Sequence, residues 1–281
     1  MNNRAGEHAA RVHGIFAAVA PRYDFLNHLL SAGLDHRWRS RAAGACGTAK
    51  TVLDVCCGTG DLARALLARR GRRIVACDFS PPMLARARRK LADAMRAGRA
   101  AVLLADALRL PLADGSVDAA ASAFGLRNLE DPAEGLAEMV RVVRPGGRVV
   151  VLEFHAPEGR GLRARAFLLY FRRVLPTLAR WAAGPDRGGY RHLVDSVEAF
   201  GPAEATLQRM RAAGLEAVTV ERLPGGIAAV FGGRKPRSNG LGPCIAPNVS
   251  SSRRRSATTS ATAAAGPTCP RPTCIWASRS W

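Results

Sequence analysis

Asp54 lies inside an apolar stretch of β type, and a few residues later the chain turns through Gly58, Thr59 and Gly60. An amphipathic helical pattern follows at once. A strand, a glycine turn and a helix present backbone N–H groups to a nucleotide-like ligand in many α/β sheets. Glycine lets the backbone take a positive φ and approach such a ligand closely. The spacing therefore predicts a loop that binds a nucleotide-like cofactor.

Two features of this loop bear on which cofactor it binds. Ala63 stands where the third glycine of the dinucleotide pattern G-x-G-x-x-G would fall, which weakens the case for NAD. The carboxylates of Asp54 and Asp61 beside the turn suit a cationic ligand better than a pyrophosphate. The loop resembles the first motif of class I S-adenosylmethionine (SAM) methyltransferases.

Asp78 ends a second short apolar stretch, 18 residues beyond Gly60. An acid at the end of the second strand can accept hydrogen bonds from a ribose 2′- and 3′-hydroxyl pair. Both NAD and SAM carry that ribose, so Asp78 does not choose between them. The alternative role for Asp78 is to stabilise the N-terminus of the helix that follows.

The composition limits the class of partner. The chain has 281 residues, 48% of them hydrophobic, enough for one large or two small domains. Only three of its 42 basic residues are lysines, so arginine supplies nearly all of the +20 charge. An excess of arginine over lysine is typical of a genome with a biased nucleotide composition, so the charge alone does not indicate a nucleic-acid-binding surface. Aromatic residues, which would stack on bases, are only 6% of the chain, so we expect no nucleic-acid partner. A basic surface still favours anionic membranes.

The cysteines indicate the compartment. None of the seven has zinc-ligand spacing, and we expect no metal. The odd count, with a central Cys56-Cys57 pair, indicates reduced thiols in the cytoplasm. The sequence shows no signal peptide and no apolar run of about 18 residues, so it predicts no membrane-spanning segment.

Helical and extended patterns alternate after the glycine turn, which predicts a doubly wound parallel sheet. The last two strands predict an antiparallel hairpin that finishes this sheet. The expected helices are 83–95, 132–143 and 203–213, and the expected strands after Asp78 are 101–105, 117–124, 148–154, 217–222 and 226–232.

Three segments fall outside the alternating pattern. Residues 1–50 read as helices that either cap a cofactor or pack on the outside of the sheet. Residues 163–183 read as an arginine-rich helix, which either binds anionic lipid headgroups or packs as a lid. Residues 236–281 lack a core-forming pattern, so we expect a disordered tail there.

Five stretches between about residue 12 and residue 235 resemble the quinone-biosynthesis C-methyltransferases, the demethylmenaquinone methyltransferase and 2-polyprenyl-6-methoxy-1,4-benzoquinol methylase family. The glycine loop and the Pro-Gly-Gly turn occur in many methyltransferases, whereas the YD-x-x-N and FGLRN patterns are particular to this family. The five stretches are YDFLNHLLSAGLDHRW (23–38), VLDVCCGTGD (52–61), FGLRNLED (124–131), RVVRPGGRVVVLEF (141–154) and YRHL (190–193).

The resemblance implies a Rossmann-like class I SAM methyltransferase sheet, with an N-terminal helical cap (1–50) and a helical insertion before the C-terminal hairpin. The methyltransferase domain would span 51–235. The resemblance also implies SAM contacts at Thr59, Asp78, Asp106 and Ala107, beside Asp54 and the loop glycines. Many members have a serine where this chain has Ala123. Ser122 comes one residue earlier and is expected to face the other side of the strand. Ala123 therefore cannot supply the hydroxyl contact to the cofactor that the serine would make.

C-methylation of a phenol ring needs a phenolate, so stabilising that charge is the main electrostatic task. Arg127 and Asn128 follow the fourth strand at the edge where ligands bind in α/β sheets. Arg127 would stabilise the phenolate; the alternative is a salt bridge to Glu130 or Asp131. Tyr190 and His192 could line the acceptor pocket, with His192 as a base near neutral pH.

The expected function is thus SAM-dependent C-methylation of a prenylated quinol, demethylmenaquinol first, by a cytoplasmic enzyme with peripheral membrane contact. One alternative is a SAM methyltransferase for another acceptor: a benzoquinol, a soluble metabolite or RNA. Another is a non-catalytic homologue in a lipid-biosynthesis complex. A homo-oligomer is compatible with each of these.

Overall fold

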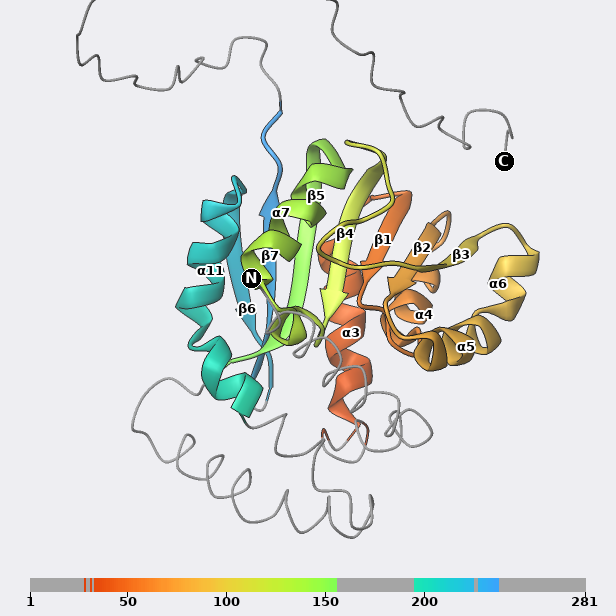
Figure 1. The fold of residues 1–281 in the computed structure, drawn as a ribbon, viewed down its shortest axis with the longest axis horizontal. Helices are drawn as coiled ribbons and strands as arrows, with labels where there is room; N and C mark the ends of the chain where they lie inside the picture. Colours follow the sequence, from red (N-terminus) through yellow and green to blue (C-terminus); the bar gives the residue numbers. More distant parts are fainter. Residues whose placement is uncertain (1–27, 29–30, 32, 156–194, 225–226, 238–281) are drawn as a thin grey trace, which may run out of the picture. The chain divides into compact units, whose positions relative to one another are not determined.

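The computed structural model describes residues 28, 31, 33–155, 195–224 and 227–237. They form a seven-stranded sheet in the order β3-β2-β1-β4-β5-β7-β6, with helices on its faces (Figure 1). The strands are β1 (Thr51–Val55), β2 (Arg73–Asp78), β3 (Ala100–Leu104), β4 (Val117–Ala123), β5 (Val143–Phe154), β6 (Glu216–Arg222) and β7 (Ala228–Arg234). The helices are α3 (Leu34–Ala45), α4 (Asp61–Leu67), α5 (Pro81–Lys90), α6 (Ala92–Arg96), the 3₁₀ turn η1 (Leu126–Asn128), α7 (Pro132–Val142) and α11 (Ala203–Ala212).

Strands β1 to β5 pair in parallel, and β7 runs antiparallel to both β5 and β6. The predicted parallel sheet with a closing hairpin is therefore confirmed. Asp54 of β1 is in register with Ala76 of β2 and with Ala121 of β4. The carboxyl ends of these three strands consequently meet at one edge of the sheet.

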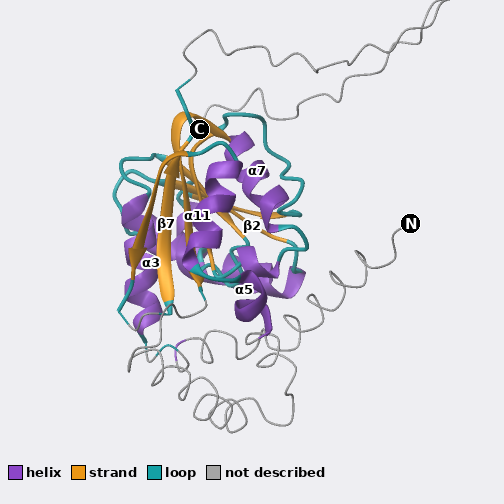
Figure 2. Cartoon of the chain, turned by 90° about the vertical axis from the view of Figure 1, so that its left-hand side faces the viewer, coloured by secondary structure: helices purple, strands orange, loops and turns teal. Residues whose placement is uncertain are grey.

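Alternate residues of the strands enter two separate cores because successive side chains point to opposite faces. Val52 and Val150 pack with residues of α3, α4 and α5. Leu53 and Val149 pack on the other face with residues of α7 and α11. Figure 2 shows α3 on one side of β7 and both α7 and α11 on the other. The continuous apolar runs that marked the buried strands reflect this burial on both faces.

The last strand, expected over 226–232, is β7 at Ala228–Arg234, and two other elements differ from the predicted ones in a way that matters for the fold. The helix expected over 83–95 begins earlier, at the Pro81-Pro82 pair, and is broken at Leu91 into α5 and α6. The strand expected over 148–154 begins at Val143, so the Pro-Gly-Gly turn lies inside β5. A Cβ on Gly147 would stand 2.5 Å from the carbonyl oxygen of Asp118, so only glycine fits there.

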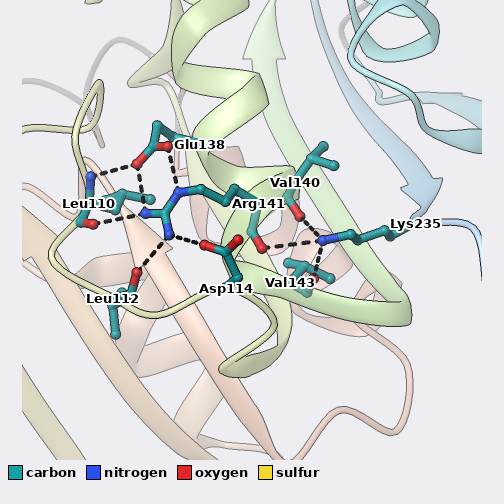
Figure 3. A network of polar contacts seen from close by, with 8 residues as sticks. All are labelled: Leu110, Leu112, Asp114, Glu138, Val140, Arg141, Val143 and Lys235. Atoms are coloured by element: carbon teal, nitrogen blue, oxygen red, sulfur yellow. Dashed lines mark hydrogen bonds and ion pairs between the residues drawn. The ribbon is translucent and has the colours of Figure 1, made fainter. Parts of the chain in front are cut away.

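Arg141 of α7 holds the loop between β3 and β4 (Figure 3). Its guanidinium donates to the carbonyl oxygens of Leu110 and Leu112, at 2.9 and 2.8 Å, and pairs with Asp114 at 2.6 Å. It also pairs with Glu138 at 2.7 Å, and Glu138 accepts from the Leu110 amide at 2.8 Å. These contacts lower the pKa of Glu138 and raise that of Arg141. The loop that follows β3 is thereby tied to the helix beneath it.

Lys235 secures the end of the same helix (Figure 3). Its ammonium group donates to the carbonyl oxygens of Val140, Arg141 and Val143 at 2.8, 3.2 and 2.8 Å. Carbonyls in the last turn of a helix lack intrahelical partners, and a lysine satisfies them well. The residue after β7 therefore contributes to the fold.

Several predicted segments lie outside the described residues. These include residues 1–27, the arginine-rich segment 163–183 and residues 238–281 of the predicted tail 236–281. The chain separates into units 1–238 and 239–281. Helix α3, which belongs to the predicted cap, packs on α4 and on the sheet. The two roles considered for residues 1–50 both stay predictions. Within the described part of the chain, no helix is both long and apolar enough to span a bilayer.

Candidate active site

Strands β1 and β4 are each followed directly by a non-glycine residue with a left-handed backbone. Cys56 has a φ of 56° and Phe124 a φ of 60°. Such conformations are costly for residues with a Cβ and concentrate at functional sites. Val55, directly before Cys56, is in register with Ser122, which lies two residues before Phe124. The chain therefore turns sharply at two adjacent points of the carboxyl edge.

A cavity lies at these turns. A Cβ on Gly125 would stand 2.4 Å from the Cβ of Cys56, so the two turns can approach each other only with glycine at 125. The lining combines the ends of β1, β2 and β4 with one residue of α5. It comprises Cys56, Gly58, Asp78, Phe79, Met83, Ala123, Phe124, Gly125, Asn128 and Leu129. We call this the first cavity.

Asp78 holds the glycine loop against the end of β2. One of its carboxylate oxygens accepts from the amide of Gly58 at 2.8 Å, and the other accepts from the amide of Ser80 at 2.9 Å. Ser80 is the N-cap of α5, so Asp78 supports a helix start and also lines the first cavity. A carboxylate offers about four lone-pair positions, which leaves acceptor capacity for ribose hydroxyls.

A second cavity lies across the glycine loop. It shares Cys56, Gly58 and Ala123 with the first. Its lining comprises Arg39, Asp54, Cys56, Cys57, Gly58, Thr59, Asp61, Leu62 and Ala123. We call this the second cavity, and a ligand that crosses the loop at Gly58 would reach both.

Asp61 and Thr59 are both engaged by Lys90 of α5. The lysine ammonium forms an ion pair with Asp61 and contacts the hydroxyl oxygen of Thr59 at 3.1 Å. Asp61 therefore has a cation of the protein beside it already, which argues against its being the main group for a cationic ligand.

The described cysteines are protonated thiols. Burial raises the pKa of both Cys46 and Cys77 to about 12, and it also raises those of Cys56 and Cys57. All four are free of disulfides. Because the thiolate is the reactive form, none of these residues is a nucleophile near neutral pH.

Asp106 and Ala107 follow β3 at the same edge. The amide of Ala105 donates to the carbonyl oxygen of Asp78 at 3.0 Å, which places the pair next to the end of β2. Asp106 is exposed, and its carboxylate accepts from the amide of Leu108 at 2.9 Å, whereas Ala107 is buried. Neither residue lines the two cavities. The SAM contacts predicted for Asp106 and Ala107 stay predictions.

Arg127 lies beside the first cavity but points to Glu153. The two side chains form a 2.6 Å ion pair and are 8% and 0% exposed. Arg127 also donates to the carbonyl oxygen of Phe124 at 2.8 Å, and its guanidinium lies 5.4 Å from the ring centroid of Phe154. A salt bridge was the alternative considered for Arg127, but the partners named for it, Glu130 and Asp131, were wrong.

Asn128 and Ala123 face the first cavity. The amide of Asn128 donates to the carbonyl oxygen of Phe124 at 3.1 Å. Ala123 follows the alternation of Ala119 and Ala121, which face α3. Ser122, between Ala121 and Ala123 in the chain, faces the other side of the sheet, as expected, and lines neither cavity.

Comparisons with known proteins decide the family. The model of the ubiE/COQ5 methyltransferase family matches residues 4–235. The chain belongs to the ubiE/COQ5 methyltransferase family.

Curated relatives agree with this assignment. The demethylmenaquinone methyltransferase of Thermus thermophilus is 48% identical over 79% of this chain and 100% of its own length. That of Deinococcus radiodurans is 46% identical over 80% of this chain and 92% of its own length. The ubiquinone/menaquinone biosynthesis C-methyltransferase UbiE of Geobacter sulfurreducens is 39% identical over 83% and 91%.

Solved structures confirm the predicted class I methyltransferase fold. A SAM-dependent methyltransferase of Thermotoga maritima, described as a possible histamine N-methyltransferase, has a TM-score of 0.55 at 19% identity and covers 80% of this chain and 99% of its own. A putative SAM-dependent methyltransferase of Methanococcus maripaludis has a TM-score of 0.55 at 20% identity, covering 79% and 94%. These similarities concern the fold alone.

The residues of this ubiE/COQ5 methyltransferase fit SAM. Asp78 presents a hydrogen-bonded carboxylate to the first cavity, as a ribose requires. Asp54 is fully buried, and among the described residues no well-formed hydrogen bond reaches either of its carboxylate oxygens. A buried acid whose oxygens lack well-formed hydrogen bonds is costly, and it suits a cationic ligand group. The predicted catalytic residues Tyr190 and His192 lie outside the described residues.

Sequence reasoning assigned no role to Arg39 or to the acid Asp35. Asp35 accepts from Nδ1 of His28 at 2.8 Å and from the Ser31 hydroxyl at 2.9 Å, and it forms an ion pair with Arg39. Burial would raise the pKa of Asp35, but these partners hold it below its usual value. The spacing of Asp35 and Arg39, four residues apart in α3, was the available signal.

His28, Asp35 and His36 are close enough to ligate a metal, but Arg39 already neutralises the carboxylate.

Proposed function

We propose that this methyltransferase acts on a ring carbon of a prenylated quinol and that demethylmenaquinol is its preferred acceptor. Membership of the ubiE/COQ5 family supports SAM-dependent C-methylation in quinone biosynthesis. The observation that carries the choice of acceptor is the naming of the relatives. Those from Thermus and Deinococcus, at 48% and 46% identity, are demethylmenaquinone methyltransferases, whereas the 39% relative is named for both quinones.

An aromatic cluster beside the first cavity supports a flat apolar acceptor. Phe124 lines the cavity, and Phe154 stacks on it with ring centroids 4.5 Å apart. Trp38 of α3 lies 6.3 and 6.2 Å from these two rings. The ring edges and faces of such a cluster favour offset or perpendicular packing with another aromatic ring.

The bound cofactor supplies a methyl group made transferable by a sulfonium. The chain must orient the acceptor carbon toward it and keep water away, because alignment alone contributes much of the rate. Asp78 and the Gly58 loop would fix the cofactor, and the apolar lining would exclude water. The ring hydroxyl of the quinol loses its proton so that the ring carbon becomes nucleophilic, and the ring proton leaves after the methyl group is attached.

The role proposed for Arg127 follows from its contacts. Its guanidinium is engaged by Glu153 and by the carbonyl oxygen of Phe124. We therefore assign it first to holding the turn after β4, which carries Asn128 into the cavity, and only through that turn to the phenolate. Residues 190 and 192 stay proposed acceptor-side residues, with His192 as the base. Membrane contact through 163–183 and a homo-oligomeric state also stay predictions.

Quinones extracted from cells that lack the protein would test the choice of acceptor. The proposal predicts a naphthoquinone one methyl group short, restored to menaquinone when the wild-type chain is returned and not when the Asp78→Ala variant is returned. Accumulation of a benzoquinone precursor instead would favour the second acceptor class. Unchanged quinones, together with an undermethylated RNA or soluble metabolite, would contradict quinol methylation.

A further inference from the structure

A third cavity lies beside the C-terminal end of α3, over the strands β5, β7 and β6. Its volume is about 340 Å³, and β6 is the edge strand of the sheet. Helix α11 packs on the other face of β6 and β7, whereas α3 packs on this face over β5 and β7 only. The lining includes Arg148, Val150, Thr219, Val230, Gly232 and Arg234. We call this the third cavity.

Two arginines without a carboxylate partner stand at one end of the third cavity. Arg148 of β5 and Arg234 of β7 are directly opposite each other, so their side chains leave the same face of the sheet. Among the described residues, the side chain of Arg148 donates only to the carbonyl oxygen of Ala45, at 3.1 Å, and that of Arg234 has no polar partner. Like charges directly opposite each other are destabilising. An anion bound between them would remove this cost.

The acids near the third cavity do not supply that anion. Glu221 lines the cavity, but its carboxylate pairs with Arg41 at 3.1 Å. Glu216 of β6 is in register with Arg234, yet in the described part of the chain no ion pair joins the two. The arginine end of the cavity therefore stays positive and suits carboxylates, which a guanidinium binds through two parallel hydrogen bonds.

Gly232 keeps the third cavity open. It lies between Val230 and Arg234 on the same face of β7 because alternate residues of a strand share a face. Its φ is not positive, and a Cβ there would meet only the hydroxyl oxygen of Thr219 within 4 Å, at 3.3 Å. The backbone would thus accept a side chain at this position, and that side chain would fill the cavity. Without one, the apolar side chains of Val150 and Val230 form part of the lining.

Charge indicates that the occupant comes from another molecule. The chain carries +20, so a second copy would add to the positive charge. Its own ends fit no better, because residues 1–27 have three arginines against two acids and no acid follows Glu221. A nucleic acid lacks a platform here, since the lining has no aromatic side chain on which a base could stack.

We propose that the third cavity is a docking site for an acidic, extended segment of a partner protein. Its carboxylates bind Arg148 and Arg234, and an apolar side chain lies over Val150 and Val230. The pair of Arg148 and Arg234 and the pair of Phe154 and Ala228 are the two ends of the ladder between β5 and β7. The candidate active site lies at the Phe154 end, so a docked partner would leave that site open.

An acidic peptide tests this on the full chain. A fluorescein-labelled peptide of alternating glutamate and valine would be titrated with the protein at about 0.15 M salt, where weak attraction between distant charges is screened. The control peptide carries glutamine in place of glutamate. We expect the glutamate peptide to bind at least about tenfold more tightly, as measured by fluorescence anisotropy. Equal affinities would contradict recognition of carboxylates, and displacement of the peptide by millimolar free glutamate would show a site for small anions instead.

Variants separate this site from general attraction to a basic protein. Arg234→Gln should weaken the glutamate peptide roughly tenfold to a hundredfold. The matched control is Arg73→Gln, which removes the charge of another exposed arginine, on β2, and should leave the affinity nearly unchanged. Equal losses in the two variants would overturn the proposal.

Gly232→Val fills the third cavity without a change of charge. It should weaken the glutamate peptide by at least about tenfold while its melting curve shows a folded protein, because the new side chain occupies the space that the peptide needs. Unchanged affinity in this variant would overturn the proposal.

Photo-crosslinking would locate the bound peptide. A diazirine on the glutamate peptide, followed by mass spectrometry, should mark residues of β6 and β7, and these crosslinks should be lost in Gly232→Val. Crosslinks confined to the basic segment 239–281 would overturn the proposal, because the peptide would then bind outside the third cavity.

Discussion

Removing Arg127 should destabilise the protein more than any single exposed ion pair could. The side chains of Arg127 and Glu153 are 8% and 0% exposed, and a 2.6 Å contact joins them. Deleting one partner of a buried pair leaves an unpaired charge, which costs about 3–5 kcal/mol. For a domain of this size each kcal/mol lowers the melting temperature by about 2–4 °C, so Arg127→Ala should lower it by roughly 6–20 °C.

The assay is urea unfolding followed by circular dichroism, with melting curves alongside. Arg96→Ala is the matched control, because Arg96 and Asp93 form an ion pair whose side chains are 75% and 94% exposed. Its loss should cost about 0–1 kcal/mol. Replacing both Arg127 and Glu153 by apolar residues of similar size should recover much of the stability, since the charge is then no longer stranded.

The result that would refute this reasoning is a stable Arg127→Ala variant. If its free energy of unfolding matched the wild type while methyl transfer fell sharply, the guanidinium would act on the acceptor directly. Stability and activity lost together, with both recovered in the apolar double variant, would instead establish the positioning role.

Three further predictions follow from the structure. Asp54→Asn should raise the melting temperature of the ligand-free protein. Because the pKa of Asp54 is higher in the folded state than in the unfolded state, ionisation opposes folding, so this gain should grow as pH rises above the unfolded pKa. A gain that shrank as pH rose would contradict this. Asp78→Ala should weaken SAM by about 1.5–3 kcal/mol, and unchanged affinity in calorimetry would contradict the ribose contact. A chain ending at Pro236 should fold and bind SAM like the full chain. A chain ending at Arg234 loses the three contacts of Lys235 with carbonyl oxygens, so it should have a lower melting temperature. Equal melting temperatures of the two truncated chains would contradict the stabilising role of Lys235.

The fold could be predicted from the sequence because its signals are local. Buried parallel strands appear as short apolar runs, and the Pro-Gly-Gly turn and the glycine loop mark where segments reverse. What local pattern could not show is where an element continues through a turn. β5 begins at Val143, on the far side of that Pro-Gly-Gly turn, because its first residue pairs with Val117 before the chain reaches the turn.

The parts of the candidate site built by residues close together in the sequence were predictable, whereas the parts built by residues far apart in the sequence were not. Asp78 and the glycine loop stand at positions that a strand–turn–helix pattern defines. The partner of Arg127, Glu153, is buried on β5, 26 residues further along the chain, and no periodicity links the two. Arg39 likewise reaches the second cavity from α3, ahead of the first strand. The need for glycine at 125 arises from its contact with Cys56 across two strands.

Methyl transfer from labelled SAM to demethylmenaquinol in detergent tests the central claim most directly. The reduced and oxidised acceptors would be run side by side, with a matched benzoquinol as the competing substrate. The account predicts label on a ring carbon of the naphthoquinol and little or none on the quinone, because only the quinol can supply a phenolate. Equal rates on quinol and quinone would contradict the mechanism, and no transfer to either quinol would contradict the function.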